Sequence, residues 1–178
     1  MKIKYFMIDV EAIGQCPNYL ENRMTEFGCV IVSNPPEFAF WGIIEKKGIF
    51  PNSKTSLIVV EPTDILSYQE RLFITMRKFS HWIETHCLND FSPVFISDNN
   101  GWDYQWINWA FHSATGSNPF GHSSQNLGSL YKGKIGTMKK NFKHLRKTKH
   151  THNPVDDALG NVEALITIVN EFKIDGII

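Results

Sequence analysis

The sequence predicts a single α/β domain, residues 1–178, in which a mixed β-sheet that opens with three antiparallel strands is flanked by α-helices. Two observations predict this fold class. β-rich apolar runs fill the first quarter of the chain, and helical periodicity follows them. A chain of 178 residues with 42% hydrophobic content can also bury one substantial core.

The first predicted elements are strands. Residues 3–11 form an apolar run typical of a buried strand, residues 27–32 form a second β-rich run, and residues 38–44 form a third. The turn at Asn34-Pro35-Pro36 separates the last two, so we expect an antiparallel meander. Residues 46–62 are predicted to be an irregular surface segment.

The later elements are mostly helical. An apolar stripe at helical spacing predicts an amphipathic helix over residues 67–87. A short buried strand over residues 93–97 follows it. Further helices are predicted over residues 101–114, 137–146 and 155–172.

Charge is unevenly distributed although the formal net charge is zero. No Asp or Glu occurs between Asp103 and Asp156, and this stretch carries eight of the 18 basic residues. They are Lys132, Lys134, Lys139, Lys140, Lys143, Arg146, Lys147 and Lys149, here called the basic segment. Such a segment on an otherwise acidic body is typical of polyanion binding. A solvated lysine-rich helix would also explain the positive charges, but not the missing acids.

Cysteine usage and hydropathy indicate the compartment. Cys16, Cys29 and Cys87 are far apart and match neither a disulfide framework nor a zinc motif. No apolar stretch is long enough to span a bilayer, and the N-terminus lacks the pattern of a secretory signal. We therefore expect a cytoplasmic protein with no membrane partner, and a homodimer is compatible with the sequence.

Two carboxylates end the first predicted strand. In Asp9-Val10-Glu11, the period-two geometry of a strand points both acidic side chains to one face. Carboxylates this close repel each other and resist desolvation, so a fold tolerates them best when cations lie between them. Hard oxygen ligands suit Mg²⁺ or Mn²⁺.

Asp103 is the candidate for a further ligand. It follows the strand predicted over residues 93–97, and the crevice of an α/β sheet lies at strand ends and adjoining helix starts. An acid there could instead stabilise the first turn of a helix through its dipole. Asp98 is a rival ligand that fits a turn or capping role equally well.

The last acidic cluster begins a predicted helix. Asn153 can cap it, Pro154 suits its first position, and Asp156 and Asp157 fall in its first turn. Capping explains one acid, but not two acids with His152 five residues before the second. A loop histidine that is merely exposed remains an alternative for His152.

In this order and spacing, the motifs resemble those of the DEDDh (DnaQ-like) 3′→5′ exonucleases of the ribonuclease H-like superfamily. Asp9-Val10-Glu11 is similar to the first motif, Asn99-Asn100-Gly101-Trp102-Asp103 to the second, and His152 followed by Asp157 to the third. The resemblance extends from residue 3 to about residue 172. It implies a ribonuclease H-like mixed sheet, three antiparallel strands and then parallel strands, flanked by helices.

The resemblance also implies a chemistry with two divalent cations, Mg²⁺ or Mn²⁺. Asp9, Glu11 and Asp157 would hold one cation, and Asp9 with Asp103 the second. His152 would accept the proton of the attacking water. The implied reaction removes nucleoside 5′-monophosphates from the 3′ ends of single-stranded DNA or RNA.

Substrate contacts are expected from two regions. Trp102 is the candidate for stacking on a terminal base, whereas Trp106 and Trp109 fit a buried helical stripe better. In the basic segment, the expected phosphate contacts are Lys139, Lys140, Arg146 and Lys147.

The chain departs from the family pattern in places. Ala12-Ile13-Gly14 follow the first motif, where many relatives have Thr or Phe, so an aromatic wedge cannot be placed there. Residues 118–124 match no motif to which a role can be assigned.

Other functions remain open. A catalytically silent nucleic-acid or partner-binding module on the same fold would be expected to have lost a ligand, and no ligand position is substituted here. A metal-dependent hydrolase of small phosphate esters would not need the basic segment. A zinc site formed by His144, His150 and His152 is disfavoured, because no cysteine and no helical spacing accompany them.

Overall fold

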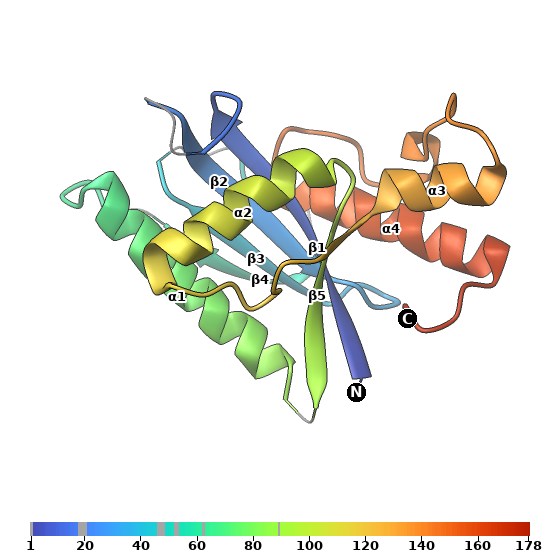
Figure 1. The fold of residues 1–178 in the computed structure, drawn as a ribbon, viewed down its shortest axis with the longest axis horizontal. Coiled ribbons are helices and arrows are strands. Elements are labelled where there is room, and N and C mark those ends of the chain that lie inside the picture. The colour runs from blue at the N-terminus through green and yellow to red at the C-terminus, as the bar shows by residue number, and fades with distance from the viewer. Residues whose placement is uncertain (1, 18–20, 46–48, 52–53, 62, 89) are drawn as a thin grey trace.

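A six-stranded sheet forms the centre of the computed structural model, which describes residues 2–17, 21–45, 49–51, 54–61, 63–88 and 90–178 (Figure 1). The strands are β1 (Lys2–Ile13), β2 (Arg23–Ile31), β3 (Phe38–Ile43), β4 (Ser56–Val60), β5 (Phe91–Ser97) and β6 (Ser124–Asn126). The helices are α1 (Tyr68–His86), α2 (Asn100–Thr115), α3 (Leu127–Ile135) and α4 (Pro154–Phe172). A 3₁₀ turn, Lys143–Leu145, lies between α3 and α4.

The strand order is β4-β3-β2-β1-β5-β6. β1, β2 and β3 form the antiparallel meander, while β4, β5 and β6 each run parallel to their neighbour. The predicted mixed sheet is therefore confirmed. β1 extends past the last residues that pair with β5, so its carboxyl-terminal half projects along β2 toward one edge of the molecule.

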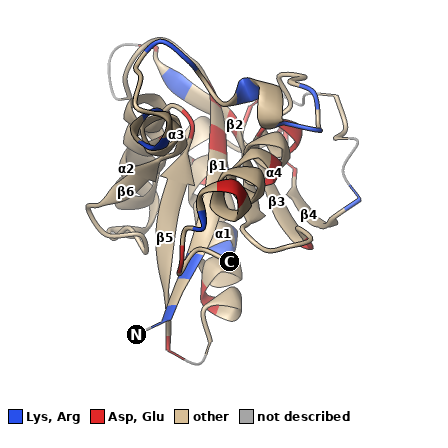
Figure 2. Ribbon diagram, turned by 90° about the vertical axis from the view of Figure 1, so that its right-hand side faces the viewer, with Lys and Arg blue, Asp and Glu red and all other residues tan. Residues whose placement is uncertain are grey.

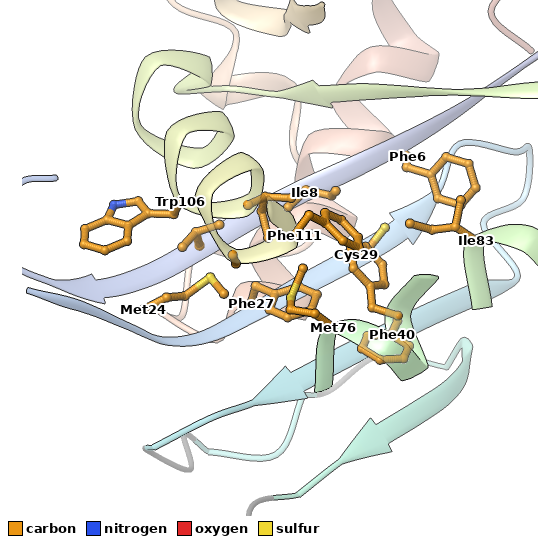
Figure 3. Packing of buried hydrophobic residues seen from close by; sticks show 14 of the residues in the cluster. Phe6, Ile8, Met24, Phe27, Cys29, Phe40, Met76, Ile83, Trp106 and Phe111 are labelled. Carbon is orange, nitrogen blue, oxygen red and sulfur yellow. The ribbon is translucent and has the colours of Figure 1, made fainter. Parts of the chain in front are cut away.

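Two hydrophobic cores lie on opposite faces of the sheet. Phe6, Ile8 and Val10 of β1 enter the core beneath α1 and α2, part of which Figure 3 shows. Met7 points the other way, into the core formed with α3 and α4. This strict alternation sets the orientation of every side chain along β1, including its acids.

The helices predicted over residues 67–87, 101–114 and 155–172 are confirmed as α1, α2 and α4. α1 begins with a capping box in which Ser67 and Glu70 satisfy each other's backbone donors. Among the described residues, no helix is both long and apolar enough to cross a membrane. The three cysteines are free.

Two predictions of local structure are wrong. Within residues 46–62, predicted to be irregular, Ser56–Val60 forms β4, because its apolar and β-branched side chains pair with the edge of β3. Residues 46–48, 52–53 and 62 of that segment lie outside the described residues. The helix predicted over residues 137–146 is absent. α3 ends before it, at Ile135, with Gly136 (φ 68°) as the C-cap, and a 3₁₀ turn at Lys143–Leu145 is the helical element within that range.

Candidate active site

β1 places the first two acids of the site. Asp9 and Glu11 project from the face of β1 opposite Ile8 and Val10, as the period-two pattern predicts. The register pairs Asp9 with Gly28 and Glu11 with Glu26 of β2, and the pairing shifts immediately after Glu11. The two carboxylates therefore lie on the face of the sheet that α4 covers.

The first turn of α4 places the third acid. The Asn153 side chain caps the helix by accepting from the backbone N–H groups of Val155 (2.9 Å) and Asp156 (3.2 Å). Asp157 is fully buried, and its Oδ1 accepts from the backbone N–H of Thr151 at 3.1 Å. The loop and the helix start thus orient this carboxylate together.

Gly28 lets α4 approach the sheet closely. A Cβ atom at this position would lie 2.3 Å from the Pro154 carbonyl carbon and 2.4 Å from the Val155 nitrogen. Because Gly28 is also the partner of Asp9 across the strands, the missing side chain brings the helix start next to that acid. Carboxylate oxygens of Asp9, Glu11 and Asp157 consequently lie within 4.8 Å of one another.

Asp103 reaches the site from the opposite layer. It lies in the first turn of α2, and its Oδ1 accepts from the backbone N–H of Val10 at 3.1 Å. Its Oδ2 is buried and has no hydrogen-bond partner among the described residues. Burial, and then the negative charge of Asp98, raise the pKa of Asp103 to about 8.

The pKa of Asp9 is raised by the same two causes, burial and neighbouring negative charge. Burial raises its pKa well above the ordinary value, and the negative charges of Asp103 and Asp157 raise it further. Four acids gathered at one strand end are unfavourable on their own, and Asp103 and Asp157 each have a buried oxygen with no hydrogen-bond partner among the described residues. Divalent cations would remove the repulsion and would give ligand partners to the buried oxygens of Asp103 and Asp157, so the residues present fit a site for hard cations.

Two histidines flank the acids on the exposed side. His152, with φ 60° in the left-handed region, carries its Nδ1 4.0 Å from Oε1 of Glu11, and its side chain is 78% exposed. Nδ1 of His150 lies 2.8 Å from Oδ2 of Asp157, an ion-pair distance without hydrogen-bond geometry. The two rings meet edge to face with centroids 4.3 Å apart.

His150 was not predicted to contact an acidic ligand. It lies two residues before His152, so an extended loop brings both side chains to one side. The contact with Asp157 depends on the loop's approach to α4, which sequence spacing does not show. His152 lies beside Glu11, while Nδ1 of His150 lies beside Oδ2 of Asp157.

Asp98 and Arg146 pair with each other, Oδ2 to Nη2 at 3.1 Å. Arg146 also donates to the side-chain oxygen of Asn161 in α4, and only 7% of its side chain is exposed. Asp98 therefore neutralises a buried cation. Arg146, expected to contact phosphate, is instead buried and paired with Asp98.

Most of the remaining basic segment is exposed, and Lys132 in α3 is half-buried. Glu163 of α4 accepts hydrogen bonds from the backbone N–H groups of Lys147 (2.9 Å) and Thr148 (2.6 Å), which fixes the loop to the helix. The side chains of Lys139, Lys140 and Lys147 remain exposed. Figure 2 shows acidic positions on β1 and α4, and basic positions along the loop between α3 and α4.

Trp102 supports the end of β1. Its indole N–H donates to the carbonyl of Val10 at 3.2 Å, its ring meets Trp106 edge to face, and it is half-buried. Trp106 is fully buried, as predicted, and Trp109 is half-buried. The ring of Trp102 therefore holds the strand end that carries Glu11.

A groove of about 630 Å³ adjoins the acids. Its described lining residues are Glu11, Ala12, Ile13, Arg23, Thr25, Glu26, Glu45 and His152. Ile13, at the position where no aromatic wedge could be placed, is 49% exposed and lines this groove. The site therefore joins a group of carboxylates to a cavity of the size that holds small ligands.

Part of the sequence is similar to a known exonuclease. No family model matches the chain. The 3′-5′ DNA exonuclease Cap18 of Escherichia coli is 36% identical over 58 residues, which make up 33% of this chain and 31% of Cap18. The match thus spans about a third of the length of that curated relative.

Solved structures share the fold over nearly the whole chain. The nuclease domain of 3′hExo, a DEDDh family member bound to rAMP, superposes with a TM-score of 0.65 at 14% identity, covering 94% of this chain and 92% of that domain. Cell-death related nuclease 4 (CRN-4) gives 0.65 at 14% identity, covering 94% and 64%. Exonuclease I of E. coli with a dA16 oligonucleotide gives 0.53 at 12% identity, covering 96% and 41%. The ribonuclease H-like fold of DEDDh exonucleases, expected from the motifs, is confirmed.

Proposed function

We propose that this chain is a metal-dependent 3′→5′ exonuclease that removes nucleoside 5′-monophosphates from single-stranded nucleic acid. One observation carries the proposal: oxygens of Asp9, Glu11 and Asp157 lie within 4.8 Å of one another at the edge of a groove. Asp103, whose buried Oδ2 has no partner in the described part of the chain, adjoins them through its hydrogen bond from Val10. The similarity to the exonucleases named above supports the reaction class.

Asp9, Glu11 and Asp157 would hold one divalent cation, and Asp9 with Asp103 a second. Two bound cations stabilise the attacking and leaving oxygens of an in-line phosphodiester displacement. His152, which lies at the groove beside Glu11, would accept the proton of the attacking water. Its high exposure lets the ring move toward the water when substrate binds.

We infer the direction of the bound strand from the order of the strands in the sheet. The groove lies over the ends of β1, β2 and β3, whereas the basic segment is anchored through Arg146 to Asp98, at the end of β5. The end of β1, which carries Asp9 and Glu11, borders the groove and lies between β2 and β5 in the sheet order. The terminal nucleotide would therefore occupy the groove, and the upstream phosphates would contact exposed lysines such as Lys139, Lys140 and Lys147.

The test uses the purified protein with Mg²⁺ or Mn²⁺ and matched single strands of DNA and RNA, labelled at the 3′ or the 5′ end. We expect the 3′ label to be released at once as a mononucleotide. The strand labelled at its 5′ end should shorten by one nucleotide at a time. Asp9→Asn is the control, since it removes a ligand charge while keeping the side-chain shape. Release from the 5′ end, cleavage of circular single strands, or undiminished activity of Asp9→Asn would contradict the proposal.

A catalytically silent binding module predicts a different result. It would bind the same strands without metal-dependent hydrolysis, whereas a hydrolase of small phosphate esters would act on mononucleotides and not on polymers. Measuring binding and cleavage on a series of strand lengths separates the three functions.

A further inference from the structure

An ion pair lines the groove beyond Glu11, because Arg23 lies across the strands from Ile13, two residues after that acid. Arg23, the first residue of β2, pairs through Nε with Oε2 of Glu45, just after β3. Nη1 of Arg23 also donates to the carbonyl of Glu21 at 2.9 Å, and the backbone N–H of Glu45 donates to Thr25 at 3.1 Å. The Arg23 side chain is therefore held between Glu45 and Glu21, and the backbone of Glu45 is fixed to β2.

The pair separates two cavities. Arg23 and Glu45 line the groove of about 630 Å³ beside Glu11, and both also line a second groove of about 510 Å³. The other described residues of the second groove are Glu21, Asn22, Tyr68, Gln69 and Trp109. Each cavity falls within the range that holds small ligands.

The second groove has the chemistry of a nucleobase site. Tyr68 and Trp109 are half-buried aromatic residues that offer ring surfaces for stacking, which tolerates any base. Asn22 and Gln69 offer amide donors and acceptors for base edges. The side chains of Arg23 and Glu45, about one third exposed, stand between this surface and the groove beside the acids.

We propose that the Arg23–Glu45 pair is the end wall of the terminal-nucleotide groove and limits each product to one nucleotide. This inference rests on the proposed exonuclease function. A strand that enters over the basic segment and crosses the acids of β1 meets the pair after its last nucleotide. Without the pair the two grooves join, and a second nucleotide can advance to Tyr68 and Trp109 before the bond is cut.

The test measures product length with the wild type, Arg23→Ala/Glu45→Ala and the charge-reversed Arg23→Glu/Glu45→Arg, on uniformly labelled single strands. The wild type should release mononucleotides. The double alanine variant should release dinucleotides as well, with the preference for one nucleotide over two reduced roughly 10-fold or more, the scale of small steric changes in a pocket. Charge reversal rebuilds the pair and should restore mononucleotides.

Two controls keep the result interpretable. Glu84→Ala removes an exposed acid on α1 and should leave the product length unchanged. The double alanine variant should melt within about 4 °C of the wild type, because an exposed ion pair contributes little to stability. If it melts lower, the single variant Glu45→Ala, which shortens one side of the wall and leaves Arg23 in place, replaces it.

The outcomes are distinguishable. A double alanine variant that releases only mononucleotides, or that hydrolyses nothing while the wild type is active, overturns the role of the pair as an end wall. If both the double alanine and the charge-reversed variants release dinucleotides, then the ion pair between the two side chains is not what forms the wall. A wild type without metal-dependent hydrolysis overturns the proposed function itself.

Discussion

Replacing Gly28 with alanine should separate Asp157 from Asp9. The new Cβ would lie 2.3–2.4 Å from the backbone of Pro154 and Val155, and an ordinary contact begins at 3.4 Å. The first turn of α4 must therefore move by about 1 Å, since neither backbone can yield locally. That movement is transmitted to Asp157, one turn into the helix.

Two effects of different size follow: a loss of stability, and a loss of function that lowers both the rate and the metal affinity. Overpacking of this kind costs about 1–3 kcal/mol of unfolding free energy. A displacement of about 1 Å at a catalytic centre can cost on the order of 10²-fold in rate. Displaced ligands should also weaken metal affinity by roughly 10–100-fold, as mutations of residues that orient ligands do.

Thermal unfolding with and without Mn²⁺ measures both effects. A ligand at about 100 times its Kd stabilises the folded state by about 2.7 kcal/mol, and a tenfold loss of affinity removes about half of that gain. Gly28→Ala should melt lower without metal and also gain less on adding Mn²⁺. Its rate of metal-dependent hydrolysis should fall in parallel.

Gly42→Ala is the matched control. Its Cβ would crowd Phe27 at 2.3 Å and Thr75 at 2.8 Å, but on the face of the sheet that α1 covers. It should lose comparable stability while keeping the full gain from Mn²⁺. If Gly28→Ala retained that gain and its rate, the close approach of α4 would not be what positions Asp157.

Three further predictions concern the acids and the histidines. Asp157→Asn should abolish hydrolysis, yet fold at least as stably without metal because a repulsive charge is gone, as assayed by cleavage rate and melting temperature. His152→Ala should lose roughly 10²–10⁴-fold in rate with Mn²⁺-dependent stabilisation intact, whereas a larger loss in His150→Ala would reassign the proton acceptor. The raised pKa of Asp103, about 8, means that the folded state binds a proton that the unfolded state releases near pH 4. The metal-free protein should therefore lose stability as the pH rises from about 4 to 8. Melting scans of Asp103→Asn should lack that part of the decline, and an identical slope would show that another group causes it.

The acids were predictable because their geometry is local. Alternation along one strand places Asp9 and Glu11 together, and the capping signature at Asn153 and Pro154 starts α4 where the sequence predicts. Such patterns depend on backbone periods of two and 3.6 residues, which neighbours in the chain reveal. The mixed sheet could be predicted from the sequence for the same reason.

The remaining features depend on contacts between distant residues. The Arg146–Asp98 pair, the approach of α4 to Gly28 and the pairing of Arg23 with Glu45 join positions 22 to 127 residues apart. β4 was missed because its run is short and follows an irregular segment. The helix predicted over residues 137–146 failed because lysine-rich composition favours helix without supplying a buried stripe.

The acids come from both helical layers of the molecule. Asp157 belongs to α4 on one face of the sheet, Asp103 to α2 on the other, and β1 carries the remaining two between them. Cations bound by all four acids would link the start of α2 and the start of α4, which pack on opposite faces of the sheet, to β1. Local opening of either helix start would then require releasing a cation, so amide hydrogen exchange in the first turns of α2 and α4 should slow together as metal binds.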